Sequence, residues 1–384
     1  MSGADFLFSH RVVFCVGPGG VGKTTISAAL AMAAARTGRR TLVVTIDPAR
    51  RLADALGVEP DDDTPTPITG HGLPPGGLPA LMLEPKRAFD ALVARLSPDA
   101  ATRDALYANR LYQHISARLA GSAEYAAMAR VQQLAAEEDI DLLVVDTPPS
   151  AHALDFIDAP SRLNGLLDPR ALQWWIRPAA NAGRLGFRWF QRGARGLLHT
   201  LERITGLGFL EDVSEFLIAF ERLTTGFRGR AREMEALLFG PDAAYVLATG
   251  PSASGVAETE AFRSHLEERG VVPVAIVANR VRSWSDPEVP LPPTDDTRRA
   301  LDDAVRAAGF DGRDVGAAAW AVLDGYARGV LCDREALDPM LADAEAAGTW
   351  VRRIPELAED VHDLSGLVRI ERFLSAADPE GKPV

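Results

Sequence analysis

The chain has 384 residues, of which 41 are Lys or Arg and 53 are Asp or Glu, so its formal net charge is −12. Apolar residues make up 47% of the sequence, which suffices for a large core and excludes disordered, collagen-like and disulfide-scaffold classes. An acidic chain lacks the clustered cations that grip nucleic-acid phosphates, so we expect no nucleic-acid partner. We expect a cytoplasmic protein, because the first residues show no secretory signal and no apolar run approaches the roughly 18 residues that cross a bilayer.

Five apolar, β-branched runs alternate with helical patterns along the chain. They cover residues 11–16, 41–46, 141–146, 243–249 and 271–279. Continuous apolar strands of this kind are typical of a parallel sheet with helices on both faces. Gly38 and Gly270 are expected to end two of the intervening helices, and Ser254 to cap the second. The pattern predicts an α/β fold with a doubly wound, mostly parallel sheet.

Three stretches depart from this alternation. Residues 58–79 and 285–296 are rich in proline and acidic residues and are expected to form exposed loops. Residues 160–239 contain helical patterns with no strand candidate between them. We therefore expect one domain over residues 1–384, with a helical subdomain at 160–240 inserted in it.

The first apolar run leads into a glycine-rich loop. Its sequence is Gly17-Pro18-Gly19-Gly20-Val21-Gly22-Lys23-Thr24-Thr25, which fits the phosphate-binding pattern G-x-x-x-x-G-K-[ST] between a strand and a helix. Glycines allow backbone N–H groups to converge on phosphate oxygens, and the positive end of the helix dipole adds to the attraction. We expect Lys23 to reach the β- and γ-phosphates of a nucleotide and the Thr24 hydroxyl to ligate Mg²⁺.

A nucleotide hydrolase also needs carboxylates at the carboxyl ends of neighbouring strands, where they position water and metal. Asp47 follows the second apolar run, and Asp146 closes the third. Each aspartate alone is also compatible with a helix cap or a turn residue. Their occurrence together with the phosphate loop favours a catalytic role for both, alongside Lys23.

These motifs resemble those of the ArsA-type ATPases, the family of the anion-pump ATPases and of the ATPase that targets tail-anchored membrane proteins. Three segments carry the resemblance, in the order of the family: GPGGVGKTT at 17–25, DPARRLADAL at 47–56 and DTPPSAHALDF at 146–156. It extends to IPELAEDVHDL at 354–364. The resemblance implies a P-loop NTPase fold with a deviant Walker A loop, a dimer, and ATP and Mg²⁺ as cofactors.

Further roles follow from the resemblance, position by position. It implies that Asp47 orients the attacking water and that Asp146 supports the coordination shell of Mg²⁺. Asn279, which ends the fifth apolar run, matches the position that reads adenine, and Pro355 lies in the segment that usually closes over the base. For Asn279, an ordinary role in a strand-end turn is the alternative.

The chain departs from the family in its loop. The second loop residue of the family is a lysine that reaches the partner's nucleotide across the dimer, whereas this chain has Pro18. Proline has neither a charge nor a backbone N–H, so one stabiliser of transition-state charge is missing. A slow ATPase, a partner subunit that carries the lysine, and local replacement by Arg50 or Arg51 are three explanations. Ala151, where the family has glycine, is a second departure.

The two cysteines bear on a metalloid function. Arsenite pumping in this family depends on a thiolate cluster, and tail-anchor targeting members often join their dimer with zinc through C-x-x-C pairs. This chain has Cys15, expected to be buried inside the first strand, and Cys332, with no neighbouring thiol in sequence. Metalloid pumping is therefore disfavoured.

The expected helical subdomain has an unusual charge for this acidic chain. Between Arg162 and Arg203 there are eight arginines against two acidic residues. Over residues 184–204, apolar residues recur at three- and four-residue steps with arginines on the other face, which predicts an amphipathic helix. Such a helix can cover a hydrophobic client, lie on a membrane surface, or simply pack against the sheet. The family resemblance favours the client.

The sequence as a whole predicts a Mg-ATP-binding and -hydrolysing ArsA-like ATPase. It would act as a conformational switch for a hydrophobic or membrane-associated client, as a homo- or heterodimer with a related ATPase. The main alternative is a nucleotide-binding, weakly catalytic or non-catalytic subunit of a heterodimer, which Pro18 keeps open. A ParA/MinD-like positioning ATPase is less favoured, because such proteins usually keep the loop lysine and lack so large an insertion.

Overall fold

The fold was analysed in a computed structural model. The structure describes residues 4–46, 52, 56, 64–110, 112–113, 122–148, 150–166, 216, 223–284, 286–310, 313–361 and 363–376.

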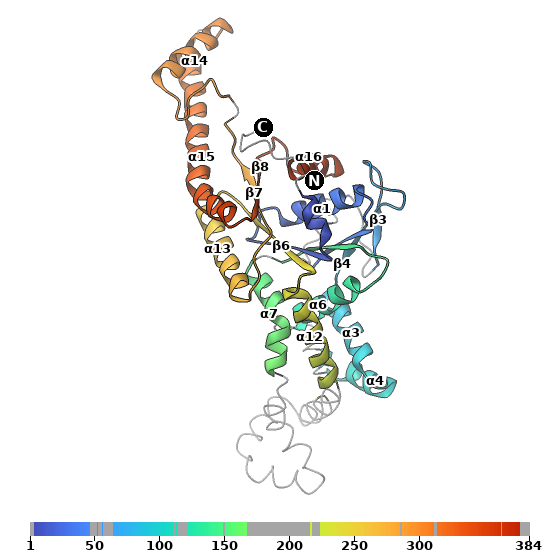
Figure 1. Ribbon diagram of the computed structural model, residues 1–384. Coiled ribbons are helices and arrows are strands. Elements are labelled where there is room, and N and C mark those ends of the chain that lie inside the picture. The colour runs from blue at the N-terminus through green and yellow to red at the C-terminus, as the bar shows by residue number, and fades with distance from the viewer. Residues whose placement is uncertain are drawn as a thin grey trace.

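The described residues build one eight-stranded sheet, with the strand order β3-β4-β2-β5-β1-β6-β7-β8 (Figure 1). The strands are β1 (Val12–Val16), β2 (Thr41–Thr45), β3 (Thr66–Ile68), β4 (Leu78–Met82), β5 (Leu142–Asp146), β6 (Ala243–Thr249), β7 (Ala275–Val281) and β8 (Trp350–Pro355). Neighbouring strands are parallel, except for the antiparallel pair β3–β4 at one edge. Strand β1 lies at the middle, between β5 and β6.

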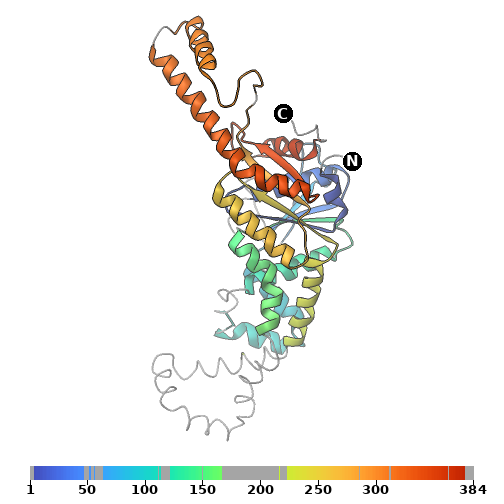
Figure 2. The ribbon, with the colours of Figure 1, turned by 60° about the vertical axis from the view of Figure 1, so that its left-hand side comes forward.

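Helices cover both faces of the sheet (Figures 1 and 2). One face carries α1 (Lys23–Arg36) and α16 (Leu364–Ser375), which contact each other through an Arg36–Glu371 ion pair. The other carries α3 (Pro85–Leu96), α6 (Ser122–Ala135), α7 (Ser150–Leu166), α12 (Thr224–Phe239), α13 (Ala253–Glu268) and the second half of α15 (Arg313–Ala346). A 3₁₀ helix (Asp5–Ser9), α4 (Ala100–Ala108) and α14 (Asp295–Ala307) complete the elements described. The predicted doubly wound α/β fold is confirmed.

The central strands are buried on both faces, which is why their sequences are continuously apolar. In β1, Val12, Phe14 and Val16 belong to the core under α7 and α12, whereas Val13 and Cys15 belong to the core under α1. Successive side chains of a strand point to opposite faces, so an apolar residue is needed at every position. The many alanines of α1 are buried and allow this helix to lie close to the sheet.

Three strands, β3, β4 and β8, were not predicted from the sequence. The expectation of an exposed loop over residues 58–79 is wrong in part, because β3 lies within it and Leu78 begins β4. Pro67 and Pro79 face each other in this pair, and prolines are tolerated near a sheet edge, where fewer backbone donors are required. Strand β8 is also at an edge, and its sequence contains two arginines, so it lacks the apolar run by which the other strands were recognised. Strand β7 begins at Ala275, four residues later than expected.

Helix ends follow the predicted glycines but not the predicted cap. Gly38 and Gly270 have φ angles of +87° and +78°, as left-handed residues that end helices do. The N-cap of α13 is Ser252, whose hydroxyl accepts a hydrogen bond from the Gly255 N–H at 3.1 Å. The prediction of Ser254 as the cap is wrong, since this residue already lies inside the first turn.

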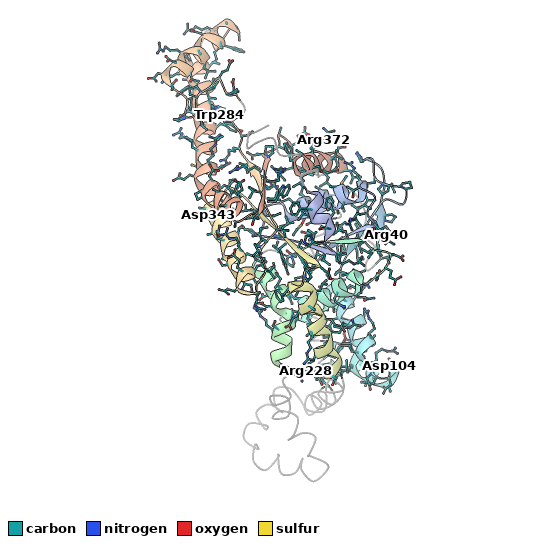
Figure 3. All side chains as sticks on the ribbon, viewed as in Figure 1. Arg40, Asp104, Arg228, Trp284, Asp343 and Arg372 are labelled. Atoms are coloured by element: carbon teal, nitrogen blue, oxygen red, sulfur yellow. The ribbon has the colours of Figure 1, made fainter. Side chains whose placement is uncertain are left out.

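A helical arm extends from the sheet between β7 and β8. The second half of α15 packs on the core through Leu337, Met340 and Leu341, while its first half projects outward with α14 beside it (Figure 2). Figure 3 places Trp284 next to this outer half, where its indole ring stacks on Tyr326 with centroids 6.3 Å apart. The predicted proline-rich loop at 285–296 leads into α14, but the arm itself was not predicted.

The predicted helical subdomain at 160–240 is described only at its two ends. Helices α7 and α12 contact each other, with the Ser161 hydroxyl donating to Glu235 at 2.9 Å. The arginine-rich segment with its amphipathic pattern lies outside the described residues, so the inserted subdomain stays a prediction. None of the helices described is long and apolar enough to cross a membrane.

The cap assignment can be tested with a matched pair of variants. Ser252→Ala removes the acceptor of the Gly255 N–H and should lower the free energy of unfolding by about 1 kcal/mol. Ser254→Ala, two residues further on, should leave it nearly unchanged. Chemical denaturation followed by circular dichroism measures both, and a larger loss in Ser254→Ala would restore Ser254 as the cap.

Candidate nucleotide-binding site

The glycine-rich loop connects the middle strand of the sheet to the first helix. Strand β1 ends at Val16 and α1 begins at Lys23, so the loop lies at the carboxyl edge of the sheet. Parallel neighbours end at the same edge, and they bring Asp146 from β5 and Gly250 after β6 to either side of it. This edge is where open α/β sheets bind their ligands.

Two loop positions require glycine for steric reasons. At Gly17, with φ +149°, a Cβ atom would lie 2.0 Å from the Ala248 carbonyl oxygen of β6. At Gly22, with φ +91°, a Cβ atom would lie 2.3 Å from the Asn279 side-chain nitrogen. Both contacts are far shorter than any real Cβ contact. The first and last glycines of the motif therefore allow β6 and β7 to approach the loop.

Lys23 is buried at the start of α1, with 7% of its surface exposed. Its Nζ donates hydrogen bonds to the carbonyl oxygens of Gly17 at 3.1 Å and Pro18 at 2.8 Å. A buried ammonium group needs such partners. The side chain thus folds back across the loop and adds its charge to the positive end of the α1 dipole, which makes the loop a site for an anion.

A cluster of oxygen atoms lies next to this cation. The Asp146 Oδ2 accepts hydrogen bonds from the hydroxyls of Thr24 at 2.8 Å and Thr45 at 3.0 Å. Asp146 and Thr45 face each other in the β2–β5 ladder, and each is 1% exposed. Thr45 was not predicted; a hydroxyl at the end of the second apolar run, beside a strand that ends in aspartate, was the available signal.

The donor set of this cluster fits Mg²⁺, because Mg²⁺ prefers oxygen ligands and usually keeps few protein ligands. Within the described part of the chain, no group of three His, Cys, Asp or Glu side chains could enclose a metal ion by itself. An ion beside Thr24 and Asp146 would therefore take its remaining ligands from phosphate oxygens and water.

Further bonds hold the loop against its neighbours. Thr147 donates its hydroxyl to the Cys15 carbonyl oxygen at 2.7 Å, which attaches the segment after β5 to the end of β1. Asn279 is buried, and its side-chain Nδ2 donates to the Val21 carbonyl oxygen at 2.9 Å. Asn279 was expected to end its strand, but it lies two residues before the end of β7, where it supports the phosphate loop.

The remaining predicted residues are spread over this edge. Gly19 and Gly20 are exposed on the rim of the loop, and Thr25 follows Thr24 in α1. Pro355 ends β8 opposite Val281 of β7, so it lies one strand beyond Asn279. Asp47, Arg50 and Arg51 lie outside the described residues, as does the side chain of Ala151.

Cys15 is completely buried below the loop, as expected, and Cys332 is exposed on α15. Burial raises the pKa of the Cys15 thiol to about 12, against a smaller opposing effect of the Ser27 hydroxyl. The thiol is therefore neutral at physiological pH. A neutral thiol enclosed in the core is a poor ligand for a soft metalloid, and Cys332 is exposed at the surface.

Comparison with known proteins agrees with this geometry. The sequence model of the anion-transporting ATPase family matches residues 10–184. An uncharacterized protein of Streptomyces coelicolor is 37% identical over 175 residues, or 45% of this chain and 42% of that protein. An ATPase named get3 from Aspergillus terreus is 30% identical over 209 residues, 53% of this chain and 58% of the other. A putative arsenical pump-driving ATPase of Halobacterium salinarum is 30% identical over 182 residues, 45% of this chain and 27% of the other.

The parallel sheet with a glycine-rich loop after its middle strand defines the class of P-loop nucleotide-binding proteins. Within this class, residues 10–184 resemble the ArsA-type ATPase family. It spans between about a quarter and three fifths of the length of the three relatives described above.

The buried thiol below the loop gives a direct test of the site's geometry. At pH 8 the folded protein should react with iodoacetamide at Cys332 and remain unmodified at Cys15, since the thiolate is the reactive form. In denaturant both cysteines should react. Mass spectrometry of tryptic peptides counts the labels, and rapid labelling of Cys15 in the folded protein would contradict the described packing beneath the loop.

Proposed function

We propose that this protein binds and hydrolyses ATP with Mg²⁺. The observation that carries the proposal is the juxtaposition of the Lys23 ammonium, held over the phosphate loop, with the Thr24 and Asp146 oxygens beside it. A cation, converging backbone N–H groups and hard oxygen ligands are the groups that phosphoryl transfer requires. The family relationship supports the same activity.

Each residue of the site has a proposed task. Residues 17–25 hold the phosphates, with Lys23 exchanging loop carbonyls for phosphate oxygens. Thr24 and Asp146 hold Mg²⁺, directly or through water, and the bound ion neutralises charge on the transferred phosphoryl group. Asp47 orients the attacking water. Asn279 and the segment at Pro355 receive the adenine.

Pro18 bears on the rate of this reaction. Its side chain is buried, and its carbonyl oxygen is already a partner of Lys23. It supplies no cation to a partner's nucleotide, so hydrolysis in this chain depends on Mg²⁺, Lys23 and a cation from elsewhere. Arg50, Arg51 or a related subunit is the proposed source. A weakly catalytic subunit of a heterodimer is the second candidate function, and Pro18 is the feature that favours it.

We further propose that the protein is a cytoplasmic dimer whose nucleotide state controls a helical region at 160–240. Its client would be hydrophobic or membrane-associated. The basic, amphipathic sequence of residues 184–204 supports this proposal, as do the relatives named get3. Metalloid pumping is not proposed, although one relative is named an arsenical pump-driving ATPase, because Cys15 is enclosed in the core and Cys332 is exposed.

The ATPase proposal is tested by Lys23→Ala. Hydrogen bonds to charged groups contribute roughly 1.5–3 kcal/mol, so Mg-ATP affinity should fall by about ten- to a hundredfold and turnover should be lost. Isothermal titration calorimetry and phosphate release measure the two effects. Lys86→Ala removes a partly exposed lysine of α3, which pairs with Asp90 and lies outside the loop, and serves as the control. Full affinity and turnover in Lys23→Ala would refute the phosphate-loop assignment.

The missing loop lysine is tested by Pro18→Lys. If a cross-subunit cation is all that limits a homodimer, turnover should rise at least about tenfold, with a dependence on protein concentration that reflects dimerisation. Because position 18 is buried, the thermal unfolding midpoint must be compared with that of the parent protein. An unchanged rate in a folded variant would favour a heterodimer or a cation from Arg50 or Arg51.

A further inference from the structure

Arg280, next to Asn279 in β7, has an unusual backbone. Its φ angle is +59°, and among the described residues His71 is the other non-glycine with a positive φ. The β7–β8 ladder shifts register between Ala278 and Val281, at this point. A left-handed backbone is strained for arginine, and proteins retain such strain mainly where the residue has a functional role. The bulge redirects the side chain of Arg280.

The redirected side chain spans two parts of the carboxyl edge. Its Nη1 lies 3.5 Å from the Gly20 carbonyl oxygen on the rim of the phosphate loop. Its Nη2 lies 3.9 Å from the Asp360 carboxylate, in the segment that follows β8. Consecutive residues of β7 therefore hold consecutive loop carbonyls: Asn279 contacts Val21 and Arg280 contacts Gly20.

The guanidinium remains accessible, because 59% of the Arg280 side chain is exposed, as is 74% of Asp360. This exposure distinguishes Arg280 from the buried Lys23 at the other end of the loop. A planar cation open to solvent can stack on an aromatic ring, which a lysine ammonium does less well.

The position along the sheet indicates which part of a nucleotide would meet it. Strand β7 is two strands from β1, and neighbouring strands are about 4.8 Å apart, so Arg280 lies roughly 10 Å from the strand that leads into the loop. Lys23 contacts Gly17 and Pro18, at the inner end of the loop, whereas Arg280 contacts its outer rim. A nucleotide with its phosphates at Lys23 would extend its base toward β7.

We infer that Arg280 forms a wall of a purine site by stacking its guanidinium plane on the base, and that the segment from Pro355 to Asp360 faces it. Asp360 holds the guanidinium across this site until the base enters. The inference rests on the proposed nucleotide binding and adds a binding residue to it. Arg280 acts here on the base and not as a substitute for the missing loop lysine.

The experiment compares ATP with inorganic tripolyphosphate, which has no base, by titration calorimetry in the presence of Mg²⁺. Arg280→Asn suits the test, because asparagine tolerates a left-handed backbone and removes the guanidinium. ATP affinity should fall about three- to thirtyfold, while tripolyphosphate affinity stays within about twofold. Arg280→Lys keeps the charge without the plane and should recover only part of the ATP affinity.

Two controls accompany these variants. Arg299→Asn removes an equally charged, exposed residue from α14 and should change neither affinity. Asp360→Asn releases the guanidinium and should leave ATP affinity equal or higher. Thermal unfolding of each variant verifies that the fold is kept.

The outcomes separate this inference from the proposed function. Unchanged ATP affinity in a folded Arg280→Asn would overturn the stacking role while leaving ATP binding intact. Equal losses for ATP and tripolyphosphate would overturn it as well and identify Arg280 as a phosphate-binding cation. If the parent protein bound tripolyphosphate but not ATP, both the base site and the proposed function would be wrong.

Discussion

The close approach of neighbouring strands to the phosphate loop is the constraint on which the rest of the site depends. The Ala248 carbonyl of β6 and the Asn279 amide of β7 occupy the space where Cβ atoms of residues 17 and 22 would lie. From the other side, Thr147 bonds the end of β1, and Asp146 bonds Thr24 at the start of α1. These backbone and side-chain contacts hold the loop in place, so its N–H groups are preorganised for an anion.

This arrangement connects the site to the helical layer. Asp146 is the last residue of β5, and α7 begins four residues later. Helix α7 packs on α12 and leads to the segment at 160–240 for which a client is proposed. A change in the Asp146–Thr24 contact on nucleotide binding or release would therefore reach α7 through only a few covalently linked residues. The arm of α14 and α15 leaves the sheet just after Arg280, so it too begins at the nucleotide edge.

The sequence predicted those parts of the fold in which burial or binding chemistry restricts which residue types can occur. The inner strands β1, β2, β5 and β6 are enclosed by helices and were recognisable as apolar runs, and the loop motif specified its own position after β1. Strands β3, β4 and β8 were missed, because β3 and β4 contain prolines and β8 contains arginines. Of these, β3 and β8 are the edge strands, where such residues are tolerated because one side of the strand lacks a partner.

At the site, the motif predicted residue types but not their mutual contacts. Arg280 directly follows Asn279, and Thr45 lies two residues before Asp47. The roles of Thr45 and Arg280 nevertheless depend on how the strands pair. Thr45 meets Asp146 because β2 and β5 pair in parallel, and Arg280 turns toward Gly20 because of a shift in the β7–β8 ladder. Thr45 and Asp146 are 101 residues apart, and Arg280 and Gly20 are 260 residues apart, so no local sequence pattern predicts these contacts.

Different groups of the proposed site would contribute to nucleotide binding and to catalysis. In the proposed site, Asn279 and the wall at Arg280 would contact the base, which takes no part in bond breaking, so they would strengthen ground-state binding. The cation that Pro18 removes would act mainly on charge that develops in the transition state. Binding energy that is equal in both states lowers KM without raising kcat. Under the proposed function, turnover would depend on a cation supplied from outside the loop, while binding of ATP would not. The proposed role as a nucleotide-controlled switch would use this difference, because an ATP-bound conformation that persists leaves time for a client to bind.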